Sequence, residues 1–332
     1  MSSLNSSLME NLSFVHPEYF YISGFTGIPF INYYFIFLIF TYIIAVFGNS
    51  FVAVIILTDR SLHVPKYLGI FNLALADIGE TNALIPALIK TFFVDSQYIS
   101  YDACLVNMFF VFFFSSVQAL TLVVLAYDRF IAICLPLRYY MIVNNYFMSV
   151  VLIGVWSVCS AFNGTTVALI TRLSFCKSNV VKSYFCDYGP VYSLACNDKT
   201  INSVMAKLCS TLFIYIPLIF IVLSYLGIFM ALSKITTWAG RLKALKTCVS
   251  HLLAVGVFFL PIIITYFATY VSMSLSPNAR IINTSLSSAI PSMLNPVIYV
   301  LNTKEFKVYL MKMIKKRSSV KPQVLAKCQL TV

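Results

Sequence analysis

The sequence predicts an all-α membrane protein: a bundle of seven transmembrane helices followed by a short cytoplasmic amphipathic helix. Composition is the first indication, because 60% of the 332 residues are hydrophobic and only 10% are charged, whereas an ordinary soluble domain is about 25% charged. The second is the presence of uncharged stretches such as 31–58, longer than the roughly 20 residues that cross a bilayer as a helix. These features exclude soluble, disordered and collagen-like chains.

Seven apolar stretches follow one another along the chain, separated by short segments that contain charges, Pro, Asn or Cys. The expected spans are 31–58, 66–93, 101–134, 146–171, 199–233, 238–271 and 279–302. The chain therefore divides into an N-terminal segment (1–30), a seven-helix domain (31–302), and a cytoplasmic helix with a basic tail (303–332).

The positions of the basic residues predict how the chain is oriented. With the N-terminus outside, the cytoplasmic loops and tail hold most of the Lys and Arg, as the positive-inside rule requires. Asn5 and Asn11 then lie in extracellular Asn-x-Ser sequences and are predicted glycosylation sites. The formal charge of +12 is assigned to orientation and to contact with the lipid bilayer, not to a nucleic acid, because no folded basic domain carries it.

Four cysteines fall on the predicted outer face. Cys104 opens the third span, and Cys176, Cys186 and Cys196 are spaced ten residues apart after the fourth. An oxidising compartment favours two disulfides. A zinc site is disfavoured because close Cys-x2-Cys pairs are absent from this set. The residues alone leave three pairings open.

Five short motifs resemble those of rhodopsin-like G-protein-coupled receptors, and the resemblance covers essentially the whole chain. They are Gly48-Asn49, Leu73–Asp77, Leu125–Phe130, Ser224-Tyr225 and Asn295–Tyr299. Within that class, the features that resemble odorant receptors are the run Ala126–Arg129, the three-cysteine loop, and the segments Lys243–His251 and Pro291–Pro296. The short N-terminus and the segment Thr81–Pro86 resemble the fish-type branch.

The resemblance implies a plasma-membrane receptor that binds a small-molecule odorant and activates a heterotrimeric G protein of the stimulatory olfactory type, raising cAMP. We expect no enzyme activity, cofactor or metal centre apart from a sodium ion, since the sequence has no Gly-rich phosphate loop, G-x-S-x-G or HExxH motif. Two alternatives remain open: a non-olfactory receptor for a lipid or peptide ligand, and a membrane transporter.

Asp128 and Arg129 form a charge pair at the cytoplasmic end of the third span. On the residues alone, the favoured interpretation is a pair of helix-end charges that reach the membrane interface. The resemblance implies a latch that frees Arg129 on activation. The residues implied to act in activation and coupling are Asp128, Arg129, Tyr225, Asn295, Pro296 and Tyr299.

A polar cluster is expected inside the bundle, comprising Asn49, Asp77, Glu80 and Gln118, where the resemblance implies a sodium ion. Odorant receptors usually place a Glu eleven residues before the Arg of the Asp-Arg pair, whereas this chain has Gln118 there. Two hypotheses follow: Glu80 supplies the missing carboxyl from the neighbouring helix, or it only donates a hydrogen bond to a backbone carbonyl or to Gln118.

The resemblance also implies the disulfide pairing and the ligand pocket. It pairs Cys104 with Cys186 and Cys176 with Cys196. The implied pocket lies in the outer half of the bundle and is mostly apolar. Its residues are Met108, Val111, Phe112, Ser115, Ser116, Cys209, Ser210, Ile262, Tyr266 and Tyr270.

Overall fold

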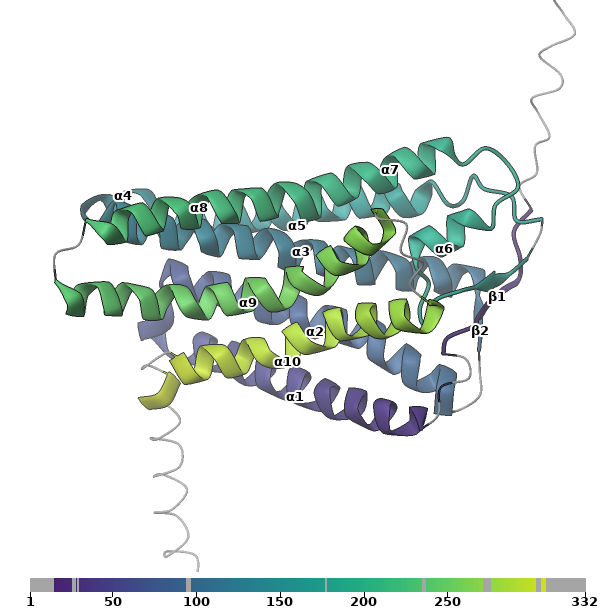
Figure 1. The fold of residues 1–332 in the computed structure, drawn as a ribbon, viewed down its shortest axis with the longest axis horizontal. Helices are drawn as coiled ribbons and strands as arrows, with labels where there is room; N and C mark the ends of the chain where they lie inside the picture. The colour runs from purple at the N-terminus through teal and green to yellow at the C-terminus, as the bar shows by residue number, and fades with distance from the viewer. Residues whose placement is uncertain are drawn as a thin grey trace, which may run out of the picture.

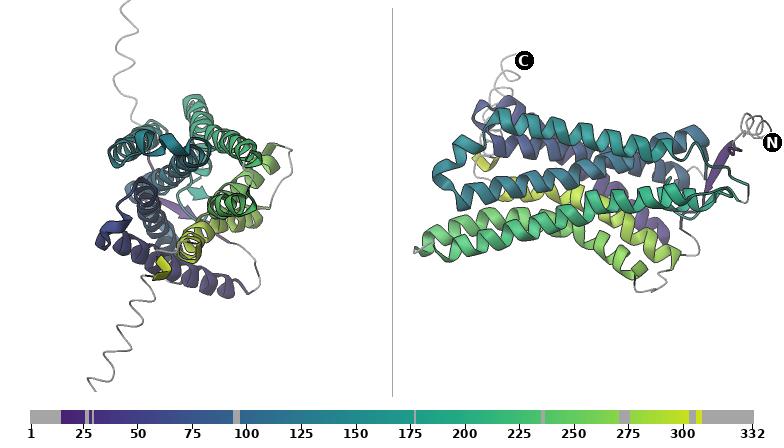
Figure 2. Two further views of the ribbon diagram at one scale, coloured as in Figure 1. Left: turned by 90° about the vertical axis from the view of Figure 1, so that its left-hand side faces the viewer. Right: turned by 90° about the horizontal axis from the view of Figure 1, so that it is seen from above.

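The computed structural model describes residues 15–25, 28, 30–93, 97–176, 178–234, 237–270, 276–302 and 306–308. Long helices dominate these residues and run side by side as one bundle (Figures 1 and 2). Their bounds are α1 (Ile31–Thr58), α2 (Pro65–Phe93), α3 (Tyr101–Cys134), α5 (Asn145–Ala168), α7 (Thr200–Ser210) continuing through η3 (Thr211–Tyr215) into α8 (Ile216–Ser233), α9 (Trp238–Tyr270) and α10 (Pro277–Asn302).

These helices confirm the predicted all-α membrane bundle, and each predicted span matches one helix, or one continuous helical run, to within a few residues. The predicted cytoplasmic helix and tail (303–332) lie outside the described residues, apart from 306–308. Among the described residues, five stretches are long and apolar enough to cross a membrane: α1, α3, α5, the run from α7 to α8, and Cys248–Thr265 of α9. Many large apolar side chains face outward, for example Phe47 and Phe229. Such exposure suits lipid and would be unfavourable in water.

Helices α2 and α10 are the more polar members of the bundle. They carry Asp77, Glu80, Ser292 and Asn295, all of which are buried. Intramembrane polar groups of this kind face the interior because exposure to lipid is costly. The polar positions therefore line the faces along which α2 and α10 pack against the other helices.

One end of the bundle, here named the sheet end, carries a small three-stranded sheet (Figure 1). Strand β1 (Tyr19–Ile22) lies in the middle, antiparallel to β2 (Tyr98–Ser100) and parallel to β3 (Val180–Val181). The short helix α6 (Tyr188–Ser193) lies at the same end. The sheet therefore joins the segment before α1 to the loops before α3 and after α5.

The opposite end, here named the α4 end, has only short helical turns between the long helices (Figure 1). They are η1 (Arg60–Leu62), η2 (Pro136–Arg138) and α4 (Tyr139–Ile142). Asn145 at the start of α5 donates to the His63 carbonyl at 2.8 Å, which ties two of these connections together.

Two local features interrupt or tighten the helix packing. The five-residue π-turn η3 immediately precedes α8, whose second residue is Pro217. A wider turn suits this position because Pro217 has no N–H to donate to the preceding turn. On the other side of the bundle, Gly48 of α1 lies against Pro296 of α10, and a Cβ added at Gly48 would lie 2.8 Å from the Pro296 Cγ. Only Gly permits this approach of the two helices.

Candidate functional site

Two disulfides fasten the sheet end. Cys104 of α3 is joined to Cys186, and Cys176 to Cys196, with Cα–Cα distances of 5.3 and 5.8 Å. These are the two pairings that the family resemblance implies. The first attaches the loop between α5 and α7 to the bundle, whereas the second closes a ring within that loop.

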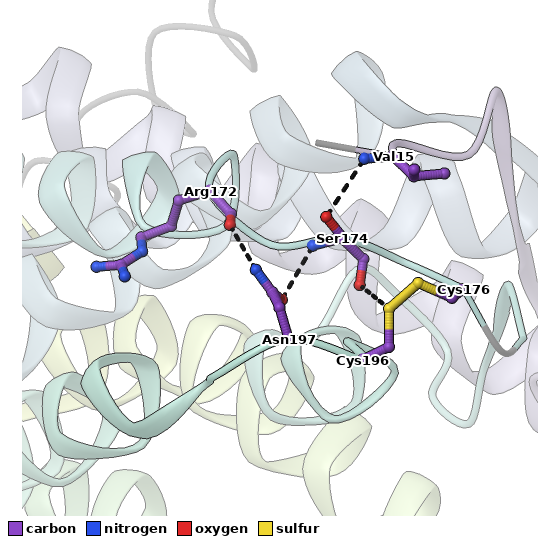
Figure 3. The surroundings of a disulfide bond; sticks show 6 residues. All are labelled: Val15, Arg172, Ser174, Cys176, Cys196 and Asn197. Carbon is purple, nitrogen blue, oxygen red and sulfur yellow. Dashed lines mark hydrogen bonds between the residues drawn. A yellow bond between two sulfur atoms is a disulfide. The ribbon is translucent and has the colours of Figure 1, made fainter. Parts of the chain in front are cut away.

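The loop around the second disulfide is held by backbone and amide hydrogen bonds (Figure 3). The Asn197 side chain accepts from the Ser174 N–H at 3.1 Å and donates to the Arg172 carbonyl at 2.9 Å. Cys196 N–H donates to the Ser174 carbonyl at 2.9 Å. The N-terminal segment joins this network because Val15 N–H donates to the Ser174 hydroxyl at 3.4 Å. The loop is therefore an ordered cover over the bundle.

The described contacts distribute the expected ligand residues among different packing clusters. Met108 and Phe112 pack beneath the sheet-end loops, whereas Val111 packs with side chains of α1, α2 and α10. Ile262 belongs to the deeper core. The side chains of Tyr266 and Tyr270 lie outside the described set.

Several polar members of that set have interaction partners on their own helix or on α5. Ser116 donates to the Phe112 carbonyl and accepts from Asn163 of α5, at 2.7 and 3.2 Å. Cys209 lies 3.4 Å from the Thr166 hydroxyl of α5, and Ser210 donates to the Ala206 carbonyl at 2.9 Å. By contrast, the Ser115 hydroxyl faces the Glu80 carboxyl of α2. Ser115 thus connects the predicted ligand set to the predicted polar cluster.

Glu80 lies in the part of the polar cluster nearer the sheet end, and its side chain is buried, at 3% exposure. Gln118 donates through Nε2 to Glu80 Oε2 at 2.7 Å. The second of the two hypotheses named this partner but had Glu80 as the donor. Ser115 of α3 and Ser288 of α10 also lie within hydrogen-bonding reach of the carboxyl. Three helices therefore converge on this one carboxyl group.

Asp77 lies in the part of the polar cluster nearer the α4 end. Asn295 donates to Asp77 Oδ2 at 2.9 Å, which joins α2 to α10. Asn49 of α1 donates to the Ser292 carbonyl at 2.8 Å. Among the described residues, Asp77 Oδ1 and the Ser292 and Tyr299 hydroxyls have no hydrogen-bond partner. Buried oxygens without partners are expensive, so this region suits a water or a cation.

The Asp-Arg pair lies at the α4 end. Arg129 Nη2 is 3.2 Å from Asp128 Oδ2, and the two side chains are 11% and 1% exposed. The Tyr139 hydroxyl of α4 donates to Asp128 Oδ1 at 2.7 Å. Burial and the adjacent Asp128 charge raise the pKa of Tyr139, which keeps the phenol protonated as a donor. Asp128 is thus held from two sides.

His251 connects α9 to its neighbours at the same end. Its Nε2 lies 3.0 Å from the Leu122 carbonyl of α3, and its Nδ1 lies 2.8 Å from the Tyr225 hydroxyl of α8. Because a carbonyl can only accept, we assign the proton to Nε2, and Tyr225 then donates to Nδ1. One neutral imidazole joins three helices.

The sequence analysis named His251 only as the last residue of the segment Lys243–His251 and gave it no role of its own. The structure instead buries it, at 5% exposure. The burial of His251 was not evident from the sequence, because the nearby Lys243 and Lys246 make the start of this helix polar. An available signal was the spacing of His251, ten residues before Pro261 and inside an apolar run.

The arrangement defines a class of protein: a multi-pass α-helical membrane protein with a loop-covered sheet end, a buried polar cluster and an Asp–Arg ion pair at the α4 end. The chain belongs to the olfactory receptor family, because the family model described as olfactory receptor matches residues 38–317. Members of this family are G-protein-coupled receptors and not enzymes, which confirms that part of the prediction.

Individual relatives cover nearly the whole chain. Olfactory receptor 51E2 of Rattus norvegicus is 34% identical over 310 residues, which are 92% of this chain and 96% of that protein. Olfactory receptor 5B2 of Homo sapiens is 36% identical over 299 residues, covering 90% and 95% of the two chains. The assignment to a fish-type branch stays a prediction.

Proposed function

We propose that this protein is an odorant receptor of the plasma membrane that binds a small-molecule odorant and activates a heterotrimeric G protein of the stimulatory olfactory type, raising cAMP. Membership of the olfactory receptor family supports ligand binding and G-protein coupling. The observation that carries the proposal is the Asp128–Arg129 pair at the α4 end. In this proposal the N-terminus is extracellular, so the sheet end receives the ligand. Asn5 and Asn11, the proposed glycosylation sites, lie outside the described residues.

Arg129 acts as the switch. In the resting state its guanidinium is bound to Asp128, which Tyr139 also holds. A ligand that binds the active conformation more tightly shifts the population towards it, and Arg129 then becomes available to the G protein. Tyr225 leaves His251, and Tyr225 and Tyr299 pack near Arg129. The Tyr299 hydroxyl suits such a move because it has no partner to lose among the described residues.

The polar cluster links the two ends. Asn49, Asp77 and Asn295 already join α1, α2 and α10, and Pro296 allows α10 to bend beside them. A sodium ion fits this region, since Asp77 Oδ1 and the Ser292 hydroxyl are buried oxygens without partners in the described part of the chain. These two groups would hold the ion, which would stabilise the resting state by neutralising Asp77.

A cell assay tests the proposal. The receptor with an N-terminal epitope is expressed with an olfactory-type G protein and exposed to a panel of small odorants, and cAMP is measured. We expect at least one odorant to raise cAMP, and Arg129→Ala to abolish the response. Arg172→Ala, at the sheet end, serves as the control that removes a positive charge elsewhere. Epitope staining of intact cells verifies surface expression and reports the side on which the N-terminus lies.

Three results would overturn the proposal. Substrate uptake or ionic current that is independent of odorants and survives Arg129→Ala would indicate a transporter. Responses to lipids or peptides in the absence of any odorant response would indicate a non-olfactory receptor. Staining only after permeabilisation, together with an intact odorant response, would refute the proposed orientation.

A further inference from the structure

Tyr184 is a loop residue with the surroundings of a core residue. It lies between β3 and α6, in the segment fastened by the Cys104–Cys186 disulfide, yet it is only 2% exposed. Its ring packs in the cluster that includes Leu84 of α2 and Ile281 of α10. The loop therefore places one aromatic side chain between the helices of the bundle.

The phenol of Tyr184 meets the polar groups around Glu80. The Ser288 hydroxyl interacts with both the Tyr184 hydroxyl and the Glu80 carboxyl. Burial and the nearby Glu80 charge raise the pKa of Tyr184, so the phenol stays protonated and can donate. A hydrogen-bond donor delivered by the loop thus lies beside acceptors from α2 and α10.

The described groups that hydrogen-bond to Glu80 are all neutral, and the nearby charged group that interacts with it, Asp77, is another acid. Gln118 donates to it at 2.7 Å, and the hydroxyls of Ser115 and Ser288 lie beside it. Within the described residues, no ion pair joins Glu80 to a Lys, Arg or His. A carboxyl in such a place is unfavourable as an anion unless a cation approaches it. A cationic group that reached this place would therefore gain a strong interaction.

We propose that Glu80, Ser115 and Ser288 form the subsite for the protonated amino group of a small amine ligand, with Tyr184 covering it in the ligand-free receptor. Val111 and Phe112 precede Ser115 on α3, and Phe112 packs against Phe185 of the loop with ring centroids 6.0 Å apart. These side chains receive the hydrocarbon part of the ligand. The inference rests on the proposed receptor function and specifies its ligand class.

The charge of the site separates amines from other small molecules. A carboxylate ligand would be repelled by Glu80, and an alcohol would provide a hydrogen bond without the charge. A charge-assisted hydrogen bond is about twice as strong as a neutral one, so an amine should be favoured over the matching alcohol by about tenfold or more in potency.

The experiment compares matched ligands in the cAMP assay: linear primary amines of four to eight carbons, with the alcohols and carboxylates of the same chain lengths. We expect amines to activate at the lowest concentrations. Glu80→Gln and Ser288→Ala should each raise the amine EC50 by about tenfold or more. Ser287→Ala is the matched control, because the Ser287 hydroxyl instead donates to the Thr284 carbonyl of its own helix at 2.7 Å. Tyr184→Phe, which removes only the hydroxyl, should lower the amine EC50.

The outcomes separate this inference from the proposed function. Activation by alcohols or carboxylates but not by amines would refute the amine subsite and leave the receptor function intact. An amine EC50 that changes no more in Glu80→Gln than in Ser287→Ala would refute it as well, as would equal shifts for amines and alcohols. If Glu80→Gln does not reach the cell surface, the amine EC50 values of Ser288→Ala and Tyr184→Phe test the inference. Values unchanged from the unmodified receptor would refute it. No response to any odorant would instead count against the function itself.

Discussion

The two ends of the bundle are held together by different kinds of interaction. At the sheet end, two disulfides and a three-stranded sheet connect the N-terminal segment to two loops, and Arg280 of α10 donates to the Lys182 carbonyl at 2.7 Å. At the α4 end, the connections between elements are single hydrogen bonds, from Tyr139 to Asp128, from His251 to the Leu122 carbonyl and from Asn145 to the His63 carbonyl. The Asp128–Arg129 ion pair at this end lies within α3. A covalent end suits a fixed ligand site, whereas an end closed by separable polar contacts suits a switch.

The largest expected effect comes from removing one disulfide at the sheet end. Cys104→Ala breaks a bridge between residues 82 positions apart, worth about 4.5 kcal/mol in the chain-entropy model, whereas Cys176→Ala breaks one spanning 20 positions, worth about 3 kcal/mol. We expect Cys104→Ala to lose more surface expression and more thermal stability in detergent. Equal losses would mean that attachment of the loop to α3 adds nothing.

The α4 end should respond to the loss of one carboxylate. Asp128→Asn removes the partner of Arg129, and a loss of about 1 kcal/mol from the closed state raises the open fraction about fivefold. Basal cAMP should therefore rise severalfold without ligand. Asp102→Asn is the control, since it neutralises an exposed acid at the sheet end of the same helix. An unchanged basal signal in Asp128→Asn would show that the pair does not close this end.

The polar cluster between the two ends offers a smaller, reciprocal test. Gln118 lies 2.7 Å from Glu80, so Glu80→Gln with Gln118→Glu moves one carboxyl across a single hydrogen bond. We expect Glu80→Gln alone to impair signalling and the double variant to restore part of it, measured as the EC50 for cAMP. If the double variant performs no better than the single one, a carboxyl from α3 cannot replace the one from α2.

The smallest expected effect concerns sodium. An ion held by Asp77 and Ser292 would stabilise the receptor by about 1 to 2 kcal/mol at saturating concentrations. The Tm of the purified receptor should be a few degrees higher in sodium chloride than in choline chloride at equal ionic strength. Asp77→Asn should remove that difference. A sodium effect that persists in the variant would assign the ion to another place.

The long helices and the contact between Asp128 and Arg129 were predictable from sequence because their signals are local. Apolar runs fix the spans, and the adjacent Asp128 and Arg129 need only one helix end to become neighbours. The structure also shows Gln118 and Glu80 in contact, which the sequence suggested only as one of two hypotheses. Local patterns thus specify which helix a residue occupies and roughly how deep it lies.

The depth to which a loop enters the bundle was not predictable. Nothing in the composition around Tyr184 distinguishes it from an ordinary aromatic residue of a cysteine-rich loop, because its burial depends on where Cys186 is anchored. The neighbours of the expected pocket residues were not predictable either: Cys209 and Ser116 interact with α5, while Val111 packs with α1, α2 and α10. Helix rotation decides these contacts, and it follows from packing against neighbours.

The difference between the two ends can be measured directly as distances within the receptor. Spectroscopic labels at Tyr140 and Trp238, both exposed, would span the α4 end, and a second pair at Tyr98 and Ile201 would span the sheet end. Comparing Asp128→Asn with the unmodified receptor in detergent requires no ligand. We predict a longer distance across the α4 end and an unchanged distance across the sheet end. A change confined to the sheet end, or no change at the α4 end, would contradict the account.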